Sequence, residues 1–376
     1  MGARQQEKLD DFGDEHYRQG LDHYINTLDA HLVDEQFRLS AASRISRNLG
    51  TRLRINEALR REPAIAHENI AQPLFLTGLP RTGTSALLNL LATDPATRTL
   101  RNWETTFPDP LPGHQPGDID PRRQYVADAI AEQRARNPGF DKIHYVDTDT
   151  SEECVMIHAL AFDGVMTGFE ILLEPYASWF QSHSLLPLYQ YFKKILQCLQ
   201  WRESGERWLL KAPAHMWAIG EIVETFGAVG VLWGHRHPRE VIPSISSMTS
   251  MIVKMFGGSI PELEDEKLGP LVMQFYANSL RSGLEKRNQL PDNIFLDYAF
   301  AEFVDSPLAL VERIYEHYGL TLDEPVSSAI QAHILKNPKG KHGSHSYNYA
   351  QYGLSEAKIE ECFDFYIADP KFNRHF

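Results

Sequence analysis

The chain has 376 residues, of which 43% are hydrophobic and 23% charged, and its formal net charge at pH 7 is −13. This composition excludes a mostly disordered chain, and the acidic balance argues against a general nucleic-acid binder. Three cysteines, Cys154, Cys198 and Cys362, form no CxxC pair, so neither a disulfide framework nor a cysteine-rich zinc site is indicated.

The N-terminal stretch is polar, and no apolar run approaches the roughly 18 residues that would span a bilayer. We therefore expect no membrane span and a cytoplasmic protein. Residues 14–62 show helical spacing of apolar side chains, beginning with Tyr17, Leu21 and Tyr24. Their second half is rich in arginine and ends at Pro63. The arginines fit either a polyanion site or a solvated helix face, and the flanking acids favour the face.

A short apolar run at 74–77 predicts a buried strand that leads directly into a glycine-containing loop at 78–85. A leucine-rich helix follows. Two similar units begin at 208–211 and 229–233, and a fourth apolar run lies at 294–297. Strands that alternate with helices predict an α/β protein with a mainly parallel sheet and helices on both faces. We expect a three-layer, P-loop-like fold.

Between the first two units, residues 100–205 read as mostly helical and carry many aromatic side chains. An insertion at the carboxyl edge of a sheet is a common place for a substrate pocket. We therefore predict a helical N-terminal extension (1–70) and one catalytic domain (71–376), with the segment 100–205 on the acceptor side. The sequence gives no indication of oligomeric state.

The loop GLPRTGTS, residues 78–85, matches both glycines of the Walker A pattern, GxxxxGK[ST]. Such glycines let successive backbone N–H groups point at an anion, and the helix that follows adds its positive end. The lysine of the pattern is missing, because Thr84 stands in its place, and the cation is Arg81 inside the loop. This loop suits a phosphate that carries one further anionic group better than a nucleoside triphosphate.

Two later segments supply further groups that could bind phosphate. Arg236 follows the strand at 229–233, and Ser244 lies eight residues on, in the next expected helix. A guanidinium fork and a hydroxyl that converge on one group suit a terminal phosphate. The segment around Lys339, Gly340 and Lys341 is the best local supply of positive charge, and we expect it to provide a second contact to that phosphate.

Together these motifs resemble the two nucleotide-binding motifs of the sulfotransferases that use 3′-phosphoadenosine 5′-phosphosulfate (PAPS). The PRTGT form of the loop is similar to that of the tyrosylprotein branch, and KAPAH at 211–215 is similar to the strand end of uncharacterised bacterial members. Tyr298 matches a family tyrosine at the nucleotide, although Ala and Phe follow it where the family carries acids. The resemblance covers nearly the whole chain.

This resemblance implies a site for PAPS made of a small set of residues. Those expected to bind the donor are Arg81, Thr82, Gly83, Thr84, Ser85, Arg236, Ser244, Tyr298, Lys339, Gly340 and Lys341. Arg81 is also expected to act in catalysis.

In the implied mechanism, Lys211 donates to the oxygen that bridges phosphate and sulfuryl group. Sulfuryl transfer needs in-line positioning and stabilisation of negative charge, and this scheme requires no metal ion. An acceptor alcohol also needs a general base. Glu104, which lies 23 residues after Arg81, is our first candidate from the resemblance, and His215 is the second.

The expected acceptor is a small, apolar molecule that carries a hydroxyl group. Two other functions remain open at this point. One is a P-loop kinase acting on a small molecule, with Asp297 at the end of a Walker B-like strand as its magnesium ligand. The other is a nucleotide-binding protein without catalytic activity.

Overall fold

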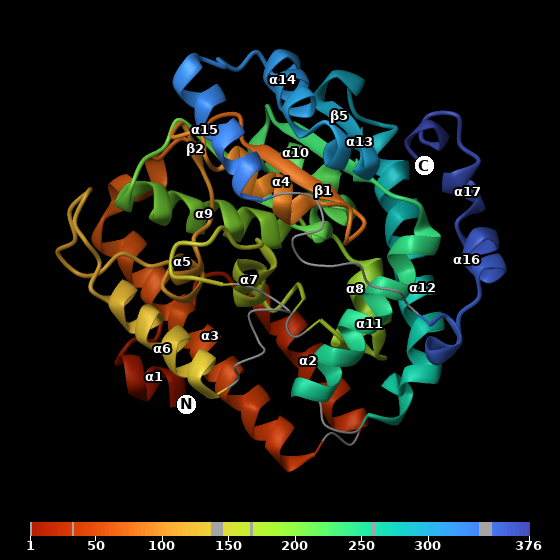
Figure 1. Ribbon diagram of the computed structural model, residues 1–376. Helices are drawn as coiled ribbons and strands as arrows, with labels where there is room; N and C mark the ends of the chain where they lie inside the picture. The colour runs from red at the N-terminus through yellow and green to blue at the C-terminus, as the bar shows by residue number, and fades with distance from the viewer. Residues whose placement is uncertain (1, 32–33, 137–145, 166–167, 257–259, 338–347) are drawn as a thin grey trace.

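The computed structural model describes residues 2–31, 34–136, 146–165, 168–256, 260–337 and 348–376 (Figure 1). Its five-stranded sheet has the order β2-β3-β1-β4-β5, and every adjacent pair is parallel. The expected α/β fold with a parallel sheet is confirmed. The strands are β1 (Leu74–Gly78), β2 (Thr97–Arg98), β3 (Arg207–Lys211), β4 (Gly230–His235) and β5 (Phe295–Ala299).

Four of these strands correspond to the four predicted apolar runs, and the two-residue edge strand β2 was not predicted.

The helices of the N-terminal half are α1 (Gly2–Glu7), α2 (Tyr17–Ala30), α3 (Glu35–Arg61), α4 (Thr84–Leu91), α5 (Asn102–Thr106), α6 (Arg122–Arg136), α7 (Val155–His158), α8 (Tyr176–Ser182) and α9 (Leu186–Arg202). Those of the C-terminal half are α10 (Ile219–Phe226), α11 (Pro238–Phe256), α12 (Asp265–Arg287), α13 (Phe300–Asp305), α14 (Pro307–His317), α15 (Glu324–Lys336), α16 (Glu356–Cys362) and α17 (Asp364–Ile367).

The strands divide their side chains between two hydrophobic cores. Leu74 and Leu76 of β1 face a smaller core with α4, α14 and α15, whereas Phe75 faces a larger core with α9, α10 and α12. The other long strands alternate in the same way. Because successive strand side chains point to opposite faces, a run that is apolar at every position is buried on both sides. The result is a three-layer arrangement with the sheet in the middle.

The N-terminal helices share the larger core with the segment that follows β2. Tyr24 of α2 and Phe37 of α3 pack with Phe169 and Tyr176. A hydrogen bond joins the two regions as well, because the side-chain oxygen Thr27 Oγ1 accepts from the Tyr176 backbone N–H at 3.0 Å. In Figure 1 these helices lie together on the side of the molecule opposite α14 and α15.

The arginines of α3 are largely engaged within the protein. Arg52 is buried and donates to the backbone oxygens of Phe12 and Leu160. Others form ion pairs, namely Arg38 with Asp29, Arg54 with Glu7 and Arg60 with Glu57. These contacts give no support to a polyanion site. Within the described ranges, no helix combines the length and apolar character needed to cross a bilayer.

Candidate functional site

The glycine-containing loop joins β1 to α4 at the carboxyl edge of the sheet. Its path requires glycine at two positions. At Gly78, where φ is +123°, a Cβ atom would lie 2.3 Å from the backbone oxygen of Gly234 in β4. Gly83 has φ of +81° and precedes the first turn of α4. The loop therefore closes tightly over the end of β4 and leaves the first N–H groups of α4 without helical partners, as an anion site needs.

The hydroxyl groups of the loop play different parts. Thr82 is fully buried, and its hydroxyl donates to the backbone oxygen of Leu79 at 2.8 Å, so it stabilises the loop itself. Thr84 is also buried. Ser85 is exposed, and its Oγ accepts a hydrogen bond of 3.0 Å from Nζ of Lys211. Of the three hydroxyls expected to bind the donor, Ser85 is thus the one that faces outward.

Arg81, Arg236 and Ser244 come together, although they follow different strands. Arg81 Nε donates to Ser244 Oγ at 3.2 Å, and Arg236 Nη1 donates to the Arg81 backbone oxygen at 3.1 Å. The guanidinium of Arg236 lies 4.2 Å from the ring centre of Phe300 and is paired with Glu240 at 2.9 Å. The structure therefore joins the two sequence motifs in one cationic region, above the point where helices leave β1 and β4 in opposite directions.

Lys211 ends β3 and points toward the same loop. Its side chain is only 3% exposed, and Nζ pairs with the carboxylate of Glu153 as well as with Ser85. The backbone N–H of Cys154 donates to the Lys211 oxygen at 2.8 Å and so holds the chain around Glu153 against the strand end. Sequence reasoning missed Glu153, because no motif marks it and the fold alone brings it beside Lys211.

Glu104 is fully buried and bound to two arginines. Arg98 donates to both of its carboxylate oxygens, at 3.0 and 2.6 Å, and Arg101 donates through its side chain at 2.8 Å and its backbone N–H at 3.0 Å. Burial raises the pKa of Glu104, but Arg98 and Arg101 outweigh it and lower that pKa to about 2. This geometry argues against the expected role of general base, because the carboxylate is closed off and reluctant to accept a proton.

His215 lies inside the larger core. It is fully buried, its Nδ1 is 2.8 Å from the hydroxyl of Tyr189, and its ring stands edge-on to Phe75. Burial, with smaller contributions from His158 and Lys211, holds the pKa of His215 well below its usual range. As a fully enclosed core side chain it cannot meet an acceptor in this conformation, so the second expected base is disfavoured as well.

Tyr298 and Asp297 also differ from expectation. Tyr298 is fully buried in the smaller core beneath the loop, whereas Phe300, two residues on, is partly exposed. Asp297 accepts hydrogen bonds of 2.7 and 2.6 Å from Arg287 and lies 2.7 Å from the imidazole of His235. It is thus occupied within the protein. No group of three or more potential metal ligands occurs within the ranges that the structure describes.

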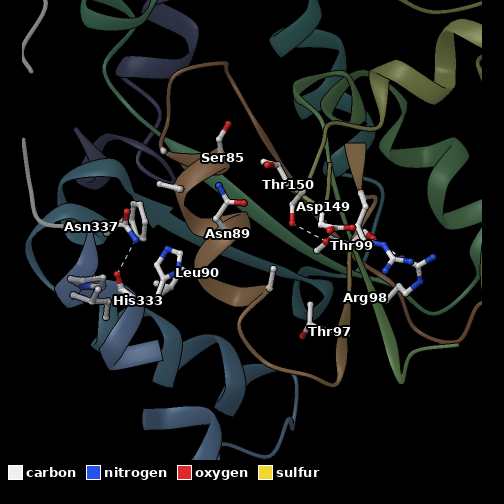
Figure 2. A pocket seen from close by; sticks show the side chains of 18 of the residues that line it. Ser85, Asn89, Leu90, Thr97, Arg98, Thr99, Asp149, Thr150, His333 and Asn337 are labelled. Carbon is white, nitrogen blue, oxygen red and sulfur yellow. Dashed lines mark hydrogen bonds between the residues drawn. The ribbon is translucent and has the colours of Figure 1, made fainter. Parts of the chain in front are cut away.

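A large cavity of about 1490 Å³ begins at the loop and extends along the outer face of α4 (Figure 2). Gly83, Ser85 and Phe300 line its end at the loop, and His333 and Asn337 line its wall near the end of α15. Lys339, Gly340 and Lys341, expected to contact a phosphate, lie outside the described residues.

Comparison with known proteins gives a consistent result. A sequence model described as "Sulfotransferase family" matches residues 73–324. The omega-hydroxy-beta-dihydromenaquinone-9 sulfotransferase Stf3 of Mycobacterium tuberculosis (strain CDC 1551 / Oshkosh) is 22% identical over 302 residues, which cover 79% of this chain and 75% of that protein.

Two solved structures share the fold over nearly their whole length. Sulfotransferase STF1 from Mycobacterium tuberculosis H37Rv has a TM-score of 0.83 and 26% identity, with 96% of each chain covered. Sulfotransferase STF9 from Mycobacterium avium has a TM-score of 0.86 and 24% identity, with 97% of this chain and 94% of that chain covered.

Proposed function

The chain belongs to the sulfotransferase family, and from this premise we propose that it transfers the sulfuryl group of PAPS to a hydroxyl of a small, lipid-like acceptor. The observation that carries the proposal is the meeting of Arg81, Arg236 and Ser244 around a loop that leads into the N-terminus of α4. Two guanidinium groups beside a helix N-terminus suit a ligand with two separated anionic ends. Membership of this family argues against the two alternative functions, a P-loop kinase and a nucleotide-binding protein without catalytic activity.

The donor would lie across this cationic region. In the proposed arrangement the loop N–H groups from Gly83 to Ser85 and Arg81 hold the 5′-phosphosulfate, and Arg236 with Ser244 holds the 3′-phosphate. Phe300 takes the place at the nucleotide that was expected for Tyr298, because Phe300 lines the cavity and Tyr298 is buried. The contact by Lys339–Lys341, a reaction without metal and a cytoplasmic location stay predictions.

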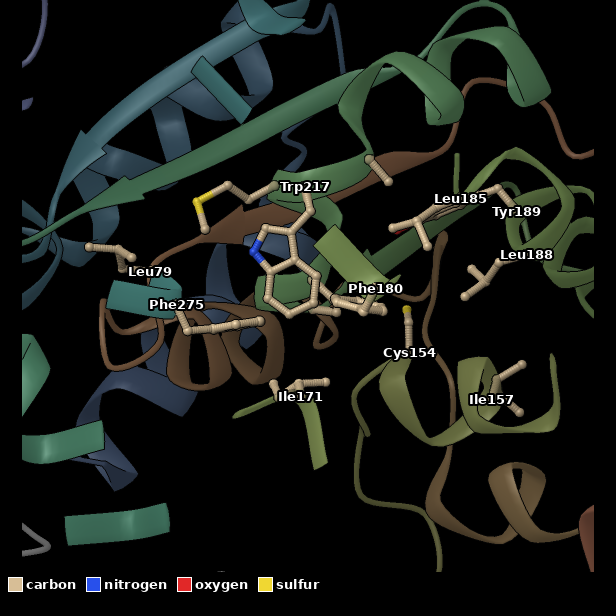
Figure 3. Packing of buried hydrophobic residues seen from close by; sticks show 14 of the residues in the cluster. Leu79, Cys154, Ile157, Ile171, Phe180, Leu185, Leu188, Tyr189, Trp217 and Phe275 are labelled. Atoms are coloured by element: carbon tan, nitrogen blue, oxygen red, sulfur yellow. The ribbon is translucent and has the colours of Figure 1, made fainter. Parts of the chain in front are cut away.

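The acceptor would approach from the side of the loop opposite the cavity. Leu79 of the loop belongs to a cluster of buried apolar side chains that includes Trp217, Phe180, Phe275 and Cys154 (Figure 3). Such surroundings suit an apolar molecule better than a sugar or a charged peptide. The similarity to Stf3, which is named as an omega-hydroxy-beta-dihydromenaquinone-9 sulfotransferase, supports a lipid-like acceptor.

The nucleotide is the first point to test. Adenosine 3′,5′-bisphosphate should stabilise the protein more than ATP with Mg²⁺, because the site offers two separated phosphate contacts and no lysine for a triphosphate chain. At a hundredfold excess over its dissociation constant, a ligand adds about 2.7 kcal/mol to the free energy of unfolding. Thermal unfolding with each nucleotide measures the difference. A larger shift with ATP and Mg²⁺ would contradict the proposed donor.

Arg236 gives a second test. Arg236→Ala should weaken PAPS binding by about 1.5–3 kcal/mol, the usual contribution of a hydrogen bond to a charged group. Adenosine 5′-phosphosulfate, which lacks the 3′-phosphate, should lose much less affinity. Arg239→Ala is the matched control, because Arg239 lies three residues further along the chain, its side chain is 48% exposed, and its guanidinium forms a long ion pair of 3.8 Å with Glu360. Equal losses for both donors in a binding titration would make Arg236 a structural residue of the loop.

A further inference from the structure

We propose that the carboxylate of Glu153 is the general base for the acceptor hydroxyl, and that Lys211 releases this carboxylate when the donor binds. This inference rests on the proposed function. It assigns a role to a residue that belongs to neither of the nucleotide-binding motifs, and it couples activation of the acceptor to the presence of the donor.

The first argument is the position of Glu153. Its side chain is 34% exposed, and its carboxylate contacts Nζ of Lys211, which also donates to Ser85 of the loop. Lys211 therefore stands between the outward-facing hydroxyl of the donor loop and the carboxylate. The hydrogen bond from the Cys154 N–H to the Lys211 oxygen keeps Glu153 beside the end of β3.

The second argument compares Glu153 with the other acid and base groups nearby. Glu104 and His215 are both fully buried, and Glu152 is 8% exposed. Of these four side chains, that of Glu153 is the most exposed. The other ionisable groups that face Glu153 are Lys211, the phenol of the partly buried Tyr276 in α12 and the thiol of Cys154. Burial raises the pKa of both the phenol and the thiol, so neither is a competing base.

The third argument is the direction from which an acceptor can arrive. Cys154, the next residue, is fully buried in the apolar cluster that also holds Leu79 and Ile157 (Figure 3). A lipid-like molecule that packs against the partly exposed margin of this cluster, where Val155 lies, would bring its hydroxyl to the neighbouring carboxylate. Glu153 thus lies where the apolar cluster meets the cationic region.

Lys211 would exchange its partner Glu153 for the donor because the donor brings additional negative charge to the loop. An ammonium group has three N–H donors and no acceptor, and Lys211 in the free protein directs them to Glu153 and Ser85. A bound phosphosulfate brings negative charge to the same loop and competes for that ammonium. When Lys211 turns to the oxygen that bridges phosphorus and sulfur, the Glu153 carboxylate loses its counter-ion and is free to accept a proton.

The chemical step balances without any further reactant. The acceptor oxygen forms a bond to sulfur while its proton passes to Glu153, and the bond between sulfur and the bridging oxygen breaks. The bridging oxygen keeps the electron pair and becomes part of the 5′-phosphate of the product nucleotide. Lys211 and Arg81 stabilise the negative charge on that leaving oxygen.

The test uses Glu153→Gln and a series of acceptors of graded acidity, from alkyl alcohols to 4-nitrophenol. Loss of a general base costs about 10²–10⁴-fold in rate. We expect that loss with alkyl alcohols, and a change of only a few-fold with 4-nitrophenol, which ionises without help near neutral pH. The acidic limb of the pH profile of kcat/KM should disappear for the alcohols. Transfer of labelled sulfate from PAPS gives the rates.

Two further variants separate chemistry from folding. Glu153→Asp keeps the carboxylate and should recover part of the rate with alcohols. Glu206→Gln is the matched control, because Glu206 is an exposed glutamate directly before the other end of β3. It should behave as the wild type in rate and in thermal unfolding. Affinity of Glu153→Gln for adenosine 3′,5′-bisphosphate should stay within a few-fold and thereby show that the donor site is intact.

The outcomes that contradict the inference are distinct from those that contradict the proposed function. An active wild type in which Glu153→Gln loses equal activity with all acceptors, or none with any, overturns the role of Glu153 as base. A wild type that transfers sulfate from PAPS to no member of the series overturns the proposed function, and the inference with it.

Discussion

Replacing Lys211 by alanine should lower the rate of sulfuryl transfer by about 10²–10³-fold, the usual cost of removing one donor to a developing oxyanion. The side chain is 3% exposed and its ammonium contacts Ser85 in the donor loop, so water cannot readily take its place. Affinity for adenosine 3′,5′-bisphosphate should change much less, because Arg81, Arg236 and the loop N–H groups remain. Single-turnover transfer from labelled PAPS and a binding titration measure the two effects.

The control for this variant is Lys254→Ala, which removes an exposed lysine paired with Asp265. It should leave rate and affinity unchanged. Because Glu153 is 34% exposed, leaving its carboxylate without Lys211 should cost little stability, whereas removal of the buried lysine stem leaves a cavity, so thermal unfolding of the alanine variant must confirm that it folds. A variant that binds the nucleotide normally and transfers sulfate at the wild-type rate would remove Lys211 from the mechanism.

Glu104→Gln should lower the free energy of unfolding by about 3–5 kcal/mol at pH 7, because breaking a buried ion pair leaves Arg98 without a counter-ion. Glu203→Gln is a close control, since Glu203 contacts the same Arg101 but is 52% exposed, and such pairs contribute about 1 kcal/mol or less. Urea unfolding of both variants gives the comparison. If Glu104→Gln kept wild-type stability but lost activity, Glu104 would return as the candidate base.

The same carboxylate predicts how stability depends on pH. The pKa of Glu104 in the folded protein is about 2, below its ordinary value of 4.5, so the unfolded chain binds more protons as pH falls. Its contribution is fully present above pH 4.5 and is lost between about pH 4.5 and pH 2. The free energy of unfolding should therefore fall more steeply over this range in the wild type than in Glu104→Gln. Parallel curves would contradict the ion-pair argument.

Much of the proposed donor site could be predicted because its signals are local in sequence. A strand followed directly by a loop with two glycines predicted the turn at Gly78 and Gly83, and parallel strands end at one edge of the sheet. The position of Arg236 after a second strand therefore placed it near Arg81. The structure brings these residues together through contacts between neighbouring strands, which the alternation of strands and helices already implied.

The surroundings of Glu104, Glu153 and Tyr298 depend on contacts between distant segments and on strand alternation. The ion pair that encloses Glu104 could not be predicted, because its partner Arg98 lies in a two-residue edge strand that has no periodic pattern. Glu153 reaches Lys211 only through the path of the helical segment after β2. Tyr298, in contrast, could have been placed from the alternation of β5, because it shares a face with Leu296, which is buried in the smaller core.

The close packing of the N-terminal helices against the segment after β2 indicates which substitutions could change the substrate preference. Gly20 of α2 lies so close to Phe162 that a Cβ atom would be 1.8 Å from its backbone oxygen, and Asn48 of α3 donates to Ala159 at 3.1 Å. Ala159 is joined to Glu153 by a single short helix. Changes in α2 and α3, outside the matched family segment, can therefore shift the reacting carboxylate, so a mutant library aimed at other acceptors should include both helices.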